Sequence, residues 1–323
     1  MIKRLLLSAL LLLVLAGGWV AWKLNDRPDL EPYAGLFLPP STTGGAELRL
    51  RFVGVSTLVF DDGETAIMTD GFFSRPGKWR VLLGRVEPDR ELIRRSLERS
   101  GVESLAAVVV AHSHYDHAMD AAEVARQTGA LLVGSNSTAN VGRGDGLAEE
   151  QIHVFGGREE LRFGDFRIEL IPSRHFPHGQ AMGDIRSPLV PPARATDYLE
   201  GGSYAILVRH RGRSLLLQAS AGFVEGGLEG VKADVVLLGV GGLGNMSAGY
   251  REAYWREVVE ATGARRVIPV HWDDFTLPLD RPLRAFPRLL DDLGSTMAFL
   301  RERTAAKGIE LRLLPTWEPV DPF

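Results

Sequence analysis

The sequence predicts an α/β protein made of two packed mixed sheets with helices on the outside. Three observations lead to this class: short apolar strand patterns dominate the middle of the chain, helical patterns are interspersed among them, and the strand patterns form two blocks. Residues 105–111 are the clearest strand, because seven consecutive apolar residues are typical of a strand buried on both faces. The 323 residues suffice for one large core.

The first block begins with alternating apolar and polar side chains over 48–52, followed by apolar runs at 56–60 and 65–69 with Asp61-Asp62-Gly63 between them. This pattern indicates strands joined by a tight turn, the start of an antiparallel sheet. Further strands are predicted at 105–110, 130–134, 151–155, 160–163, 166–172, 203–209, 214–218, 234–238, 266–270 and 309–313. Helices are predicted at 88–99, 118–127, 249–262 and 284–305.

The composition excludes several classes of protein. Apolar residues make up 45% and charged residues 24% of the chain, as in soluble globular proteins, so a disordered, collagenous or multi-span membrane protein is excluded. The net charge of −4 gives no basic surplus for nucleic-acid binding. Because the chain has no cysteine, disulfides, thiol catalysis and Cys-ligated metal sites are excluded, and any metal must be held by His and carboxylate.

The N-terminus carries a charge-free apolar run, residues 5–22, which ends in Trp19 and Trp22. Eighteen helical residues span roughly 27 Å, close to the thickness of a bilayer core, and tryptophan suits the headgroup boundary. We therefore expect residues 1–24 to be a signal anchor (a transmembrane helix) or a cleaved signal peptide, with the small-residue spacing of 14–16 available for cleavage. A buried helix is the third alternative, disfavoured because no polar residue gives it a solvent face.

The short basic head of this run favours retention of the N-terminus inside the cell. The domain would then lie outside the cytoplasm, on the periplasmic side in a bacterium. Residues 25–46 read as a linker, because four prolines and a Gly-Gly pair fall within them. The main domain is expected over 47–323.

The end of the strand at 105–111 carries the densest chemistry in the chain. Four possible metal ligands, His112, His114, Asp116 and His117, fall within six positions, although the chain has only eight His in all. His112 and His114 are two apart in an extended segment, so both rings can point to one side, while Asp116 and His117 approach from the following turn. The alternative, a polar loop that is His-rich by chance, is disfavoured by this density.

Two further histidines, His175 and His271, also follow apolar strands, where sites assemble in α/β proteins. His178 has three readings: a support for a ligand, a substrate contact or an ordinary loop residue. His153 and His210 lie within strand patterns or at their ends without acidic neighbours, which favours a satisfied or solvated histidine.

Taken together, the order of these residues resembles the metallo-β-lactamase superfamily over about residues 48–315. The motif consists of His112-x-His114-x-Asp116-His117, then His175, then His271. The segments 54–57, 68–70 and 268–272 further resemble the branch that contains L-ascorbate-6-phosphate lactonase and N-acyl-phosphatidylethanolamine phospholipase D.

The resemblance implies an αββα sandwich, hydrolytic chemistry and one or two divalent ions, usually zinc and sometimes manganese or iron. It assigns His112, His114 and His175 to the first ion. It assigns Asp116, His117 and His271 to the second, with Asp116 also orienting the attacking hydroxide or carrying its proton. Asp70, at the end of its strand, would support the site from behind the ligands.

The sequence departs from this family at one position. The family usually has Gly-Asp-Thr-Gly after a strand, with the Asp bridging the ions, whereas Ser220 takes that place here. A neutral hydroxyl leaves two dications under-neutralised, so occupancy of the second site is in question. Two alternatives stay open: compensation by Asp273 or Asp274, or a single zinc with an open position, which can still activate water.

Two other segments need an interpretation. Residues 239–244 satisfy the pattern G-x-G-x-x-G, but the helical pattern begins only near 249, so a loop beside the metal site is favoured over a dinucleotide site. The Pro- and Gly-rich segment 180–202 directly follows the loop of His175 and is either a lid over the site or an irregular insertion.

The sequence thus predicts a metal-dependent hydrolase that uses a metal-activated water on an ester, lactone or phosphodiester, with a lipid-like substrate favoured by the N-terminal run. A β-lactam is disfavoured by the finer motifs. The alternative from another class is a non-catalytic metal-binding module of the cell envelope, supported by Ser220 alone.

Overall fold

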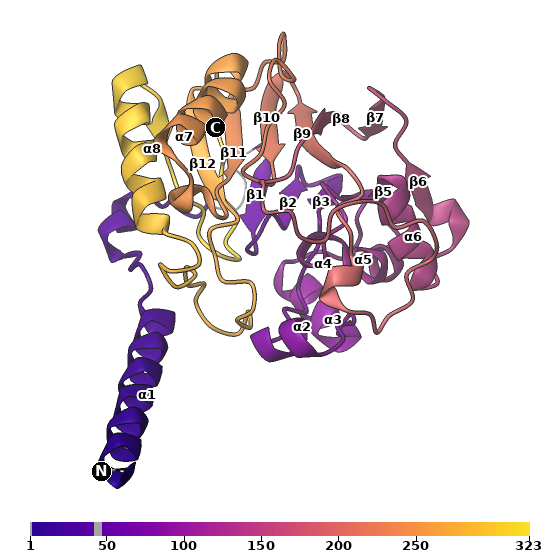
Figure 1. Cartoon of the computed structure of the whole chain (residues 1–323). Helices are drawn as coiled ribbons and strands as arrows, with labels where there is room; N and C mark the ends of the chain where they lie inside the picture. Colours follow the sequence, from indigo (N-terminus) through magenta and orange to yellow (C-terminus); the bar gives the residue numbers. More distant parts are fainter. Residues whose placement is uncertain (1, 42–46) are drawn as a thin grey trace.

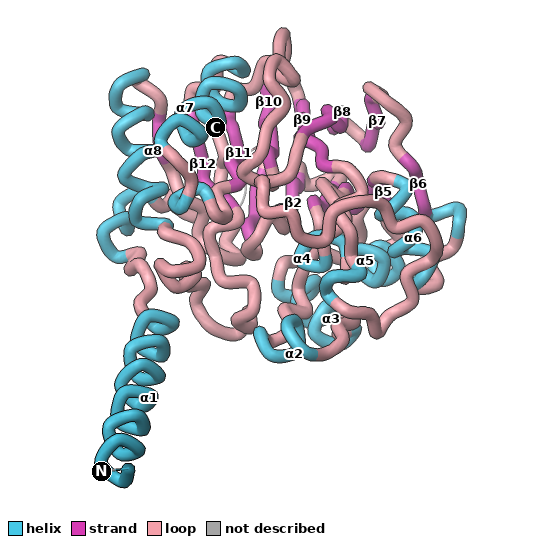
Figure 2. Tube along the Cα trace, in the orientation of Figure 1, coloured by secondary structure: helices cyan, strands magenta, loops and turns pink. Residues whose placement is uncertain are grey.

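The computed structural model describes residues 2–41 and 47–323 and confirms the predicted class. Two mixed sheets lie at the centre with helices outside (Figures 1 and 2). The first sheet has the order β1-β2-β3-β4-β5-β6 and the second β13-β12-β11-β10-β9-β8-β7. The end of the predicted linker, 42–46, lies outside the described residues, and the division into 1–24, 25–46 and 47–323 stays a prediction.

The first sheet changes direction at β3. β1 (Arg49–Phe52), β2 (Leu58–Asp61) and β3 (Ala66–Thr69) pair antiparallel, as the turn at 61–63 predicts. From β3 onward the pairing is parallel, through β4 (Ala107–Val109), β5 (Leu131–Gly134) and β6 (Ile152–Val154). The carboxyl ends of these parallel strands therefore lie at one edge of the sheet, and β4 is completely buried in its middle.

The second sheet combines a meander with a parallel part. β7 (Glu160–Phe163), β8 (Phe166–Ser173), β9 (Ser203–His210) and β10 (Arg213–Gln218) pair antiparallel. β10, β11 (Val235–Gly239), β12 (Arg266–Val270) and β13 (Glu310–Leu311) pair parallel. β8, β10 and β12 all end where His175, Ser220 and His271 follow, so the fold itself brings these positions to one side.

Helices cover the outer faces of both sheets. α3 (Arg90–Arg99), α5 (Ala121–Thr128) and α6 (Asn136–Gly144) lie on the side of the first sheet, and α5 packs on β4 and β5. α7 (Ala248–Trp255), which continues as a π-helical turn over Arg256–Glu260, and α8 (Leu293–Lys307) lie beside β11 and β12 (Figure 1).

The prediction of a helix over 284–305 is wrong in its first half. α8 begins only at Leu293, where the side chain of Asp292 caps the helix by accepting from the amide of Gly294 at 3.1 Å. Pro287 also disfavours a helix interior there. Residues 273–292 form instead an irregular segment that reaches the site described below.

The sequence patterns did not predict α2 (Lys78–Leu83) or α6, for different reasons. α2 has no buried residue, so it has no apolar periodicity to detect. α6 is built from residues of low helix propensity and is held by the Ser135 side chain, which accepts from the amide of Thr138 at 3.2 Å.

The N-terminal helix α1 (Ile2–Asn25) extends away from the rest of the chain (Figure 1). Its described apolar side chains, among them residues 10–15, are exposed. Within the described residues, however, no helix has both the length and the apolar character needed to cross a bilayer, so the prediction of a transmembrane anchor is not supported.

Candidate metal centre

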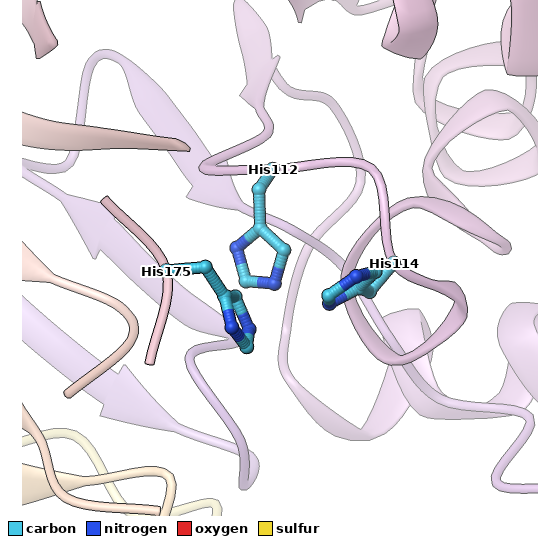
Figure 3. Close-up of side chains that lie close together, drawn as sticks. All are labelled: His112, His114 and His175. Carbon is cyan, nitrogen blue, oxygen red and sulfur yellow. The ribbon is translucent and has the colours of Figure 1, made fainter. Parts of the chain in front are cut away.

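Three histidines from two loops meet at the carboxyl ends of β4 and β8. His112 and His114 follow β4, and His175 follows β8. Their ring centroids lie 4.6–4.8 Å apart, and one ring nitrogen of each lies within 4.8 Å of the others. Figure 3 shows the three rings turned toward a common space. The sequence predicted this group as the ligands of the first ion.

A second group, also predicted, lies directly beside the first. Asp116 and His117 belong to the single turn α4 (Tyr115–Ala118), and His271 follows β12. Asp116 Oδ2 lies 3.5 Å from His117 Nε2 and 3.3 Å from His271 Nε2. The rings of His112 and His117 are 3.8 Å apart, so the two groups are neighbours.

The unused donor atoms of these residues fit a metal ion. His112 Nε2 and His117 Nε2 are buried and, among the described residues, have no hydrogen-bond partner. His117 Nδ1 lies 2.8 Å from Asp70 Oδ2, which places the proton on Nδ1 and leaves the lone pair of Nε2 facing Asp116. Buried lone pairs without partners are costly unless a cation binds them, so the donor set suits a divalent ion.

The remaining first-group rings are oriented in the same way. His114 Nε2 lies 3.2 Å from the Ala181 carbonyl, and His175 Nδ1 lies 2.8 Å from the Phe176 carbonyl. Each ring therefore donates through one nitrogen to the backbone and keeps the other as a free acceptor. These contacts supply the orientation that a metal site requires.

The electrostatics of the first group favour neutral imidazole. Burial, together with the neighbouring histidines, lowers the pKa of His112 well below its usual value and the pKa of His175 to about 3. Burial lowers the pKa of His114 in the same direction. At neutral pH these rings are neutral, the form that binds metal.

The second group is polarised by its carboxylates. Burial opposes charge on His117, but Asp70 and Asp116 outweigh it and raise the pKa of His117. Burial also opposes the charge of Asp116, but His117 and His271 outweigh it and lower the pKa of Asp116. The carboxylate is therefore ionised and is available to a cation.

Asp70 lies where a support for the second group is needed. It is fully buried at the end of β3 and adopts a positive φ of 57°, a conformation that Asp and Asn tolerate better than most residues. Its Oδ2 accepts from the Ser56 hydroxyl at 2.5 Å and from His117 Nδ1, and its Oδ1 accepts from the Ala111 amide at 2.9 Å. These bonds fix both the carboxylate and the tautomer of His117.

Ser220, which replaces the usual aspartate, points its side chain toward the loop of His175. Its Oγ accepts from the amide of Phe176 at 2.9 Å, so it shapes the backbone beside the first group. Asp273 and Asp274, which the sequence offered as compensation, lie elsewhere. Asp273 pairs with buried Arg75 at 2.7 Å. Asp274 pairs with Arg27, also at 2.7 Å, so neither belongs to a donor group.

Substitution of Ser220 therefore tests whether the negative charge of the site limits the number of bound ions. Because only Asp116 supplies a carboxylate to the two predicted ligand groups, we expect purified wild-type protein to retain about one tightly bound ion. Ser220→Asp keeps an acceptor for the Phe176 amide and adds a negative charge, so we expect about two. Elemental analysis after gel filtration measures both ratios; two retained ions in the wild type would contradict this expectation.

His178 lies beside the first group, which favours a substrate contact among its three readings. Its ring is 4.6 Å from that of His175 and 5.6 Å from that of His114, and its Nδ1 accepts from the Gln180 amide at 2.9 Å. Its other nitrogen therefore carries the proton.

The histidines expected to be structural lie outside the two donor groups. His153 pairs with Glu159 at 3.1 Å, and His210 pairs with Asp62 at 3.0 Å, so the prediction that they lack acidic neighbours is wrong. Both contacts join side chains outside the pocket that contains the metal donors.

A pocket of about 450 Å³ opens in front of the donors. Four of the predicted metal ligands line it: His114, Asp116, His175 and His271. Apolar side chains line it as well: Val81, Leu82, Phe275, Phe286 and Leu290. Gln180, Ala181, Ala195 and Thr196 also line it, so segment 180–202 borders the pocket as a lid would, although its closure stays a prediction. Tyr198 in the same segment is buried away from the pocket.

Sequence reasoning missed Asp291 in this wall. The side chain is buried, Oδ1 has no hydrogen-bond partner among the described residues, and burial raises its pKa to about 6. No motif marks it, because it lies in the segment that was assigned to a helix.

The glycine-rich segment 239–244 serves the site rather than a dinucleotide. A Cβ on Gly241 would lie 3.1 Å from His271 Nδ1, and one on Gly242, whose φ is +77°, would lie 2.6 Å from the Phe176 ring. Glycine is needed there because the backbone passes directly beside a predicted ligand. The predicted loop beside the metal site is confirmed.

Two packed mixed sheets with a His and Asp donor set at their strand ends define a metal-dependent hydrolase of the metallo-β-lactamase fold. Residues 65–272 match the family described as the beta-lactamase superfamily domain, and the chain belongs to this superfamily.

A curated relative agrees with this class, and two solved structures share the fold. A UPF0173 metal-dependent hydrolase from Heliobacterium modesticaldum is 24% identical over 254 residues, which are 76% of this chain and 91% of that protein. A metallo hydrolase from Ignicoccus hospitalis shares the fold at 17% identity and a TM-score of 0.50, over 84% of this chain and 97% of that one. A diiron β-hydroxylase from Streptomyces venezuelae also shares the fold, at 14% identity and a TM-score of 0.52. The match covers 86% of this chain and 54% of that one.

Proposed function

We propose that this enzyme hydrolyses an ester, lactone or phosphodiester that carries an apolar group, with zinc as the resident metal. The pocket carries this proposal, because its lining combines four of the predicted metal ligands with several apolar side chains. A substrate would place its polar, scissile bond at the donors and its apolar part against Leu82, Phe275 and Phe286. The resemblance to the lactonase and phospholipase branch supports the same bond classes.

The donor groups assign the roles. His112, His114 and His175 would hold one ion, and Asp116, His117 and His271 the other. A bound divalent ion supplies a nucleophile at neutral pH and polarises the bond to be cleaved. Asp116 is ionised and would orient the attacking hydroxide or carry its proton. His178 donates to the substrate through its protonated nitrogen, and Ser220 keeps the 175–176 backbone in place.

The non-catalytic alternative finds no support in the site. Ser220 was its only basis, yet the structure gives the serine a positioning contact and keeps both donor triads together. We therefore propose that the enzyme works with the ion or ions that these six residues hold.

Metal removal combined with a substrate panel tests the proposal. We expect chelation to abolish hydrolysis and added Zn²⁺ to restore it. Among p-nitrophenyl esters, kcat/KM should rise with acyl length, by about fourfold for each buried methylene until the apolar wall is covered. The panel also includes a lactone and bis-p-nitrophenyl phosphate. Equal kcat/KM for acetyl and octanoyl esters would argue against an apolar substrate, and activity that survives complete metal loss would argue against the mechanism.

We also propose that the domain acts outside the cytoplasm, as a tethered or exported enzyme. The charge-free run at 5–22 behind a basic head supports this location. N-terminal sequencing of the mature protein distinguishes a retained helix from a cleaved one, and protease treatment of intact cells against lysed cells tests the side on which the domain lies.

A further inference from the structure

Exposed large apolar side chains gather around the pocket mouth. Among the described residues outside α1, they are Trp79, Leu82, Leu83, Met182, Val190, Leu289 and Leu290. Leu82 and Leu290 line the pocket itself, and all the others except Val190 lie within two positions of a lining residue. Exposed apolar side chains that gather at one opening mark a surface where a protein partner or a membrane binds.

α2 is the main contributor to this surface. Trp79, Leu82 and Leu83 are 66–82% exposed, and the helix buries none of its residues in the domain. A surface helix normally turns its apolar residues toward the core, so packing within the domain does not explain the exposed residues of α2. Together with Leu289 and Leu290 across the pocket, these three residues form what we call the mouth rim.

α1 leaves the domain beside the same rim. Arg27, two residues past the helix, pairs with Asp274 at 2.7 Å and donates to the Ala285 carbonyl at 2.6 Å. The amide of Arg288 donates to the Asp26 carbonyl at 2.9 Å, one residue before Leu289. These contacts tie the end of α1 to the segment that carries half of the mouth rim (Figure 1).

The exposed apolar side chains of α1 indicate what binds to this surface. Each residue from 10 to 15 is apolar and 59–70% exposed, so more than one face of the helix is apolar. Trp19 and Trp22 of the same helix are also exposed, and tryptophan is the side chain that suits the headgroup boundary of a bilayer, so α1 fits the membrane interface. We propose that the mouth rim docks on a lipid bilayer together with α1, so that the pocket opens onto the membrane surface. The membrane as the source of an apolar substrate rests in addition on the proposed function.

The absence of native cysteine allows the docked face to be mapped in the full chain. Leu83→Cys and Leu289→Cys place a polarity-sensitive nitrobenzoxadiazole label on the two halves of the mouth rim. Glu64→Cys places it, as a control, on the exposed turn at the opposite end of the first sheet. The probe is a vesicle of phosphatidylcholine and phosphatidylglycerol with nitroxide-labelled acyl chains.

We expect the labels at 83 and 289 to shift to the blue and to be quenched by the nitroxide lipids, while the label at 64 stays in water. If the vesicles bind but all three labels stay in water, α1 alone attaches the protein and the proposal is overturned. A blue shift that needs high protein concentration and no vesicles would assign the surface to a second copy of the chain, which also overturns it.

A catalytic readout separates docking from chemistry. Trp79→Ser/Leu83→Ser should hydrolyse a vesicle-embedded long-chain ester at least about tenfold more slowly than the wild type, with an unchanged rate on a soluble short-chain ester. Trp79→Phe/Leu83→Met keeps the apolar surface and should keep both rates. Equal vesicle rates for the two double variants would overturn the role in substrate entry.

The label experiment repeated with Asp116→Asn makes the two failures distinguishable. An inactive protein that still docks leaves the surface proposal intact and tests only the chemistry. An active protein whose rim labels stay in water overturns the docking proposal and leaves the proposed function standing.

Discussion

Asp116→Asn should lower kcat by about 10²- to 10⁴-fold, the range expected when an enzyme loses a group that transfers a proton. Asp116 is the only carboxylate in the two predicted ligand groups, and its Oδ2 lies within 3.5 Å of both His117 Nε2 and His271 Nε2. An amide of the same shape keeps the volume but loses the charge and the proton acceptor. The measurement is kcat on the best ester of the panel with saturating Zn²⁺.

Asp120→Asn is the matched control for this substitution. Asp120 is also fully buried and lies four positions further along, but it accepts from the amides of Phe73 and Ser74, away from the donor groups. Burial raises its pKa to about 7, so the amide removes less charge there than at Asp116, whose pKa is lowered. Similar losses in both variants would show a general effect of disturbing this segment and would contradict the role of Asp116.

Metal content separates binding from catalysis in the Asp116 variant. The first group consists of three histidines and does not contain Asp116. The Asp116→Asn variant should therefore retain an ion in the first group. A variant that loses all metal would show instead that Asp116 is needed for the first group, and its low kcat would then report absence of metal.

The metal donors could be predicted from the sequence because their positions are tied to strand ends. His112, His175 and His271 each follow an apolar run that the structure confirms as a strand. Strand pairing brings the ends of β8 and β12 to one edge of the second sheet. The end of β4 belongs to the first sheet, and the packing of the two sheets brings it beside that edge. The strand ends thus marked the candidate ligands, and the resemblance to the superfamily divided them into two sets.

The pocket wall could not be predicted, because its residues carry no such pattern. Val81 and Leu82 come from a helix without a buried face, and Phe275, Phe286 and Leu290 come from an irregular segment. Their positions follow from tertiary contacts such as the pairing of Arg27 with Asp274. Asp273 illustrates the same limit: its place beside His271 suggested a ligand, but buried Arg75 pairs with it.

Asp70→Asn should weaken metal binding and lower kcat/KM by about 10- to 100-fold, the usual effect of losing the carboxylate behind a metal-binding histidine. In the wild type Asp70 Oδ2 accepts from His117 Nδ1, which keeps the proton away from Nε2. An amide can place its oxygen toward His117 only by turning its NH₂ group against the Ala111 amide, which is itself a donor.

In the opposite orientation the NH₂ group of the substituted side chain donates to His117 Nδ1 and moves the ring proton to Nε2. The lone pair that faces Asp116 is then lost, so the second group can no longer bind an ion through His117. Asparagine tolerates the positive φ of this position, so the backbone is expected to persist. Zn²⁺ titration and the thermal midpoint of the metal-free protein measure the two effects separately.

Ser56→Ala provides the comparison for Asp70→Asn. The Ser56 hydroxyl donates to the same Oδ2, but its removal leaves the bond between Asp70 and His117 in place. We expect a small loss of stability from the missing hydrogen bond, about 1 kcal/mol, with Zn²⁺ affinity nearly that of the wild type. If Ser56→Ala lost as much affinity as Asp70→Asn, the cause would be disturbed packing around β3 and not the tautomer of His117.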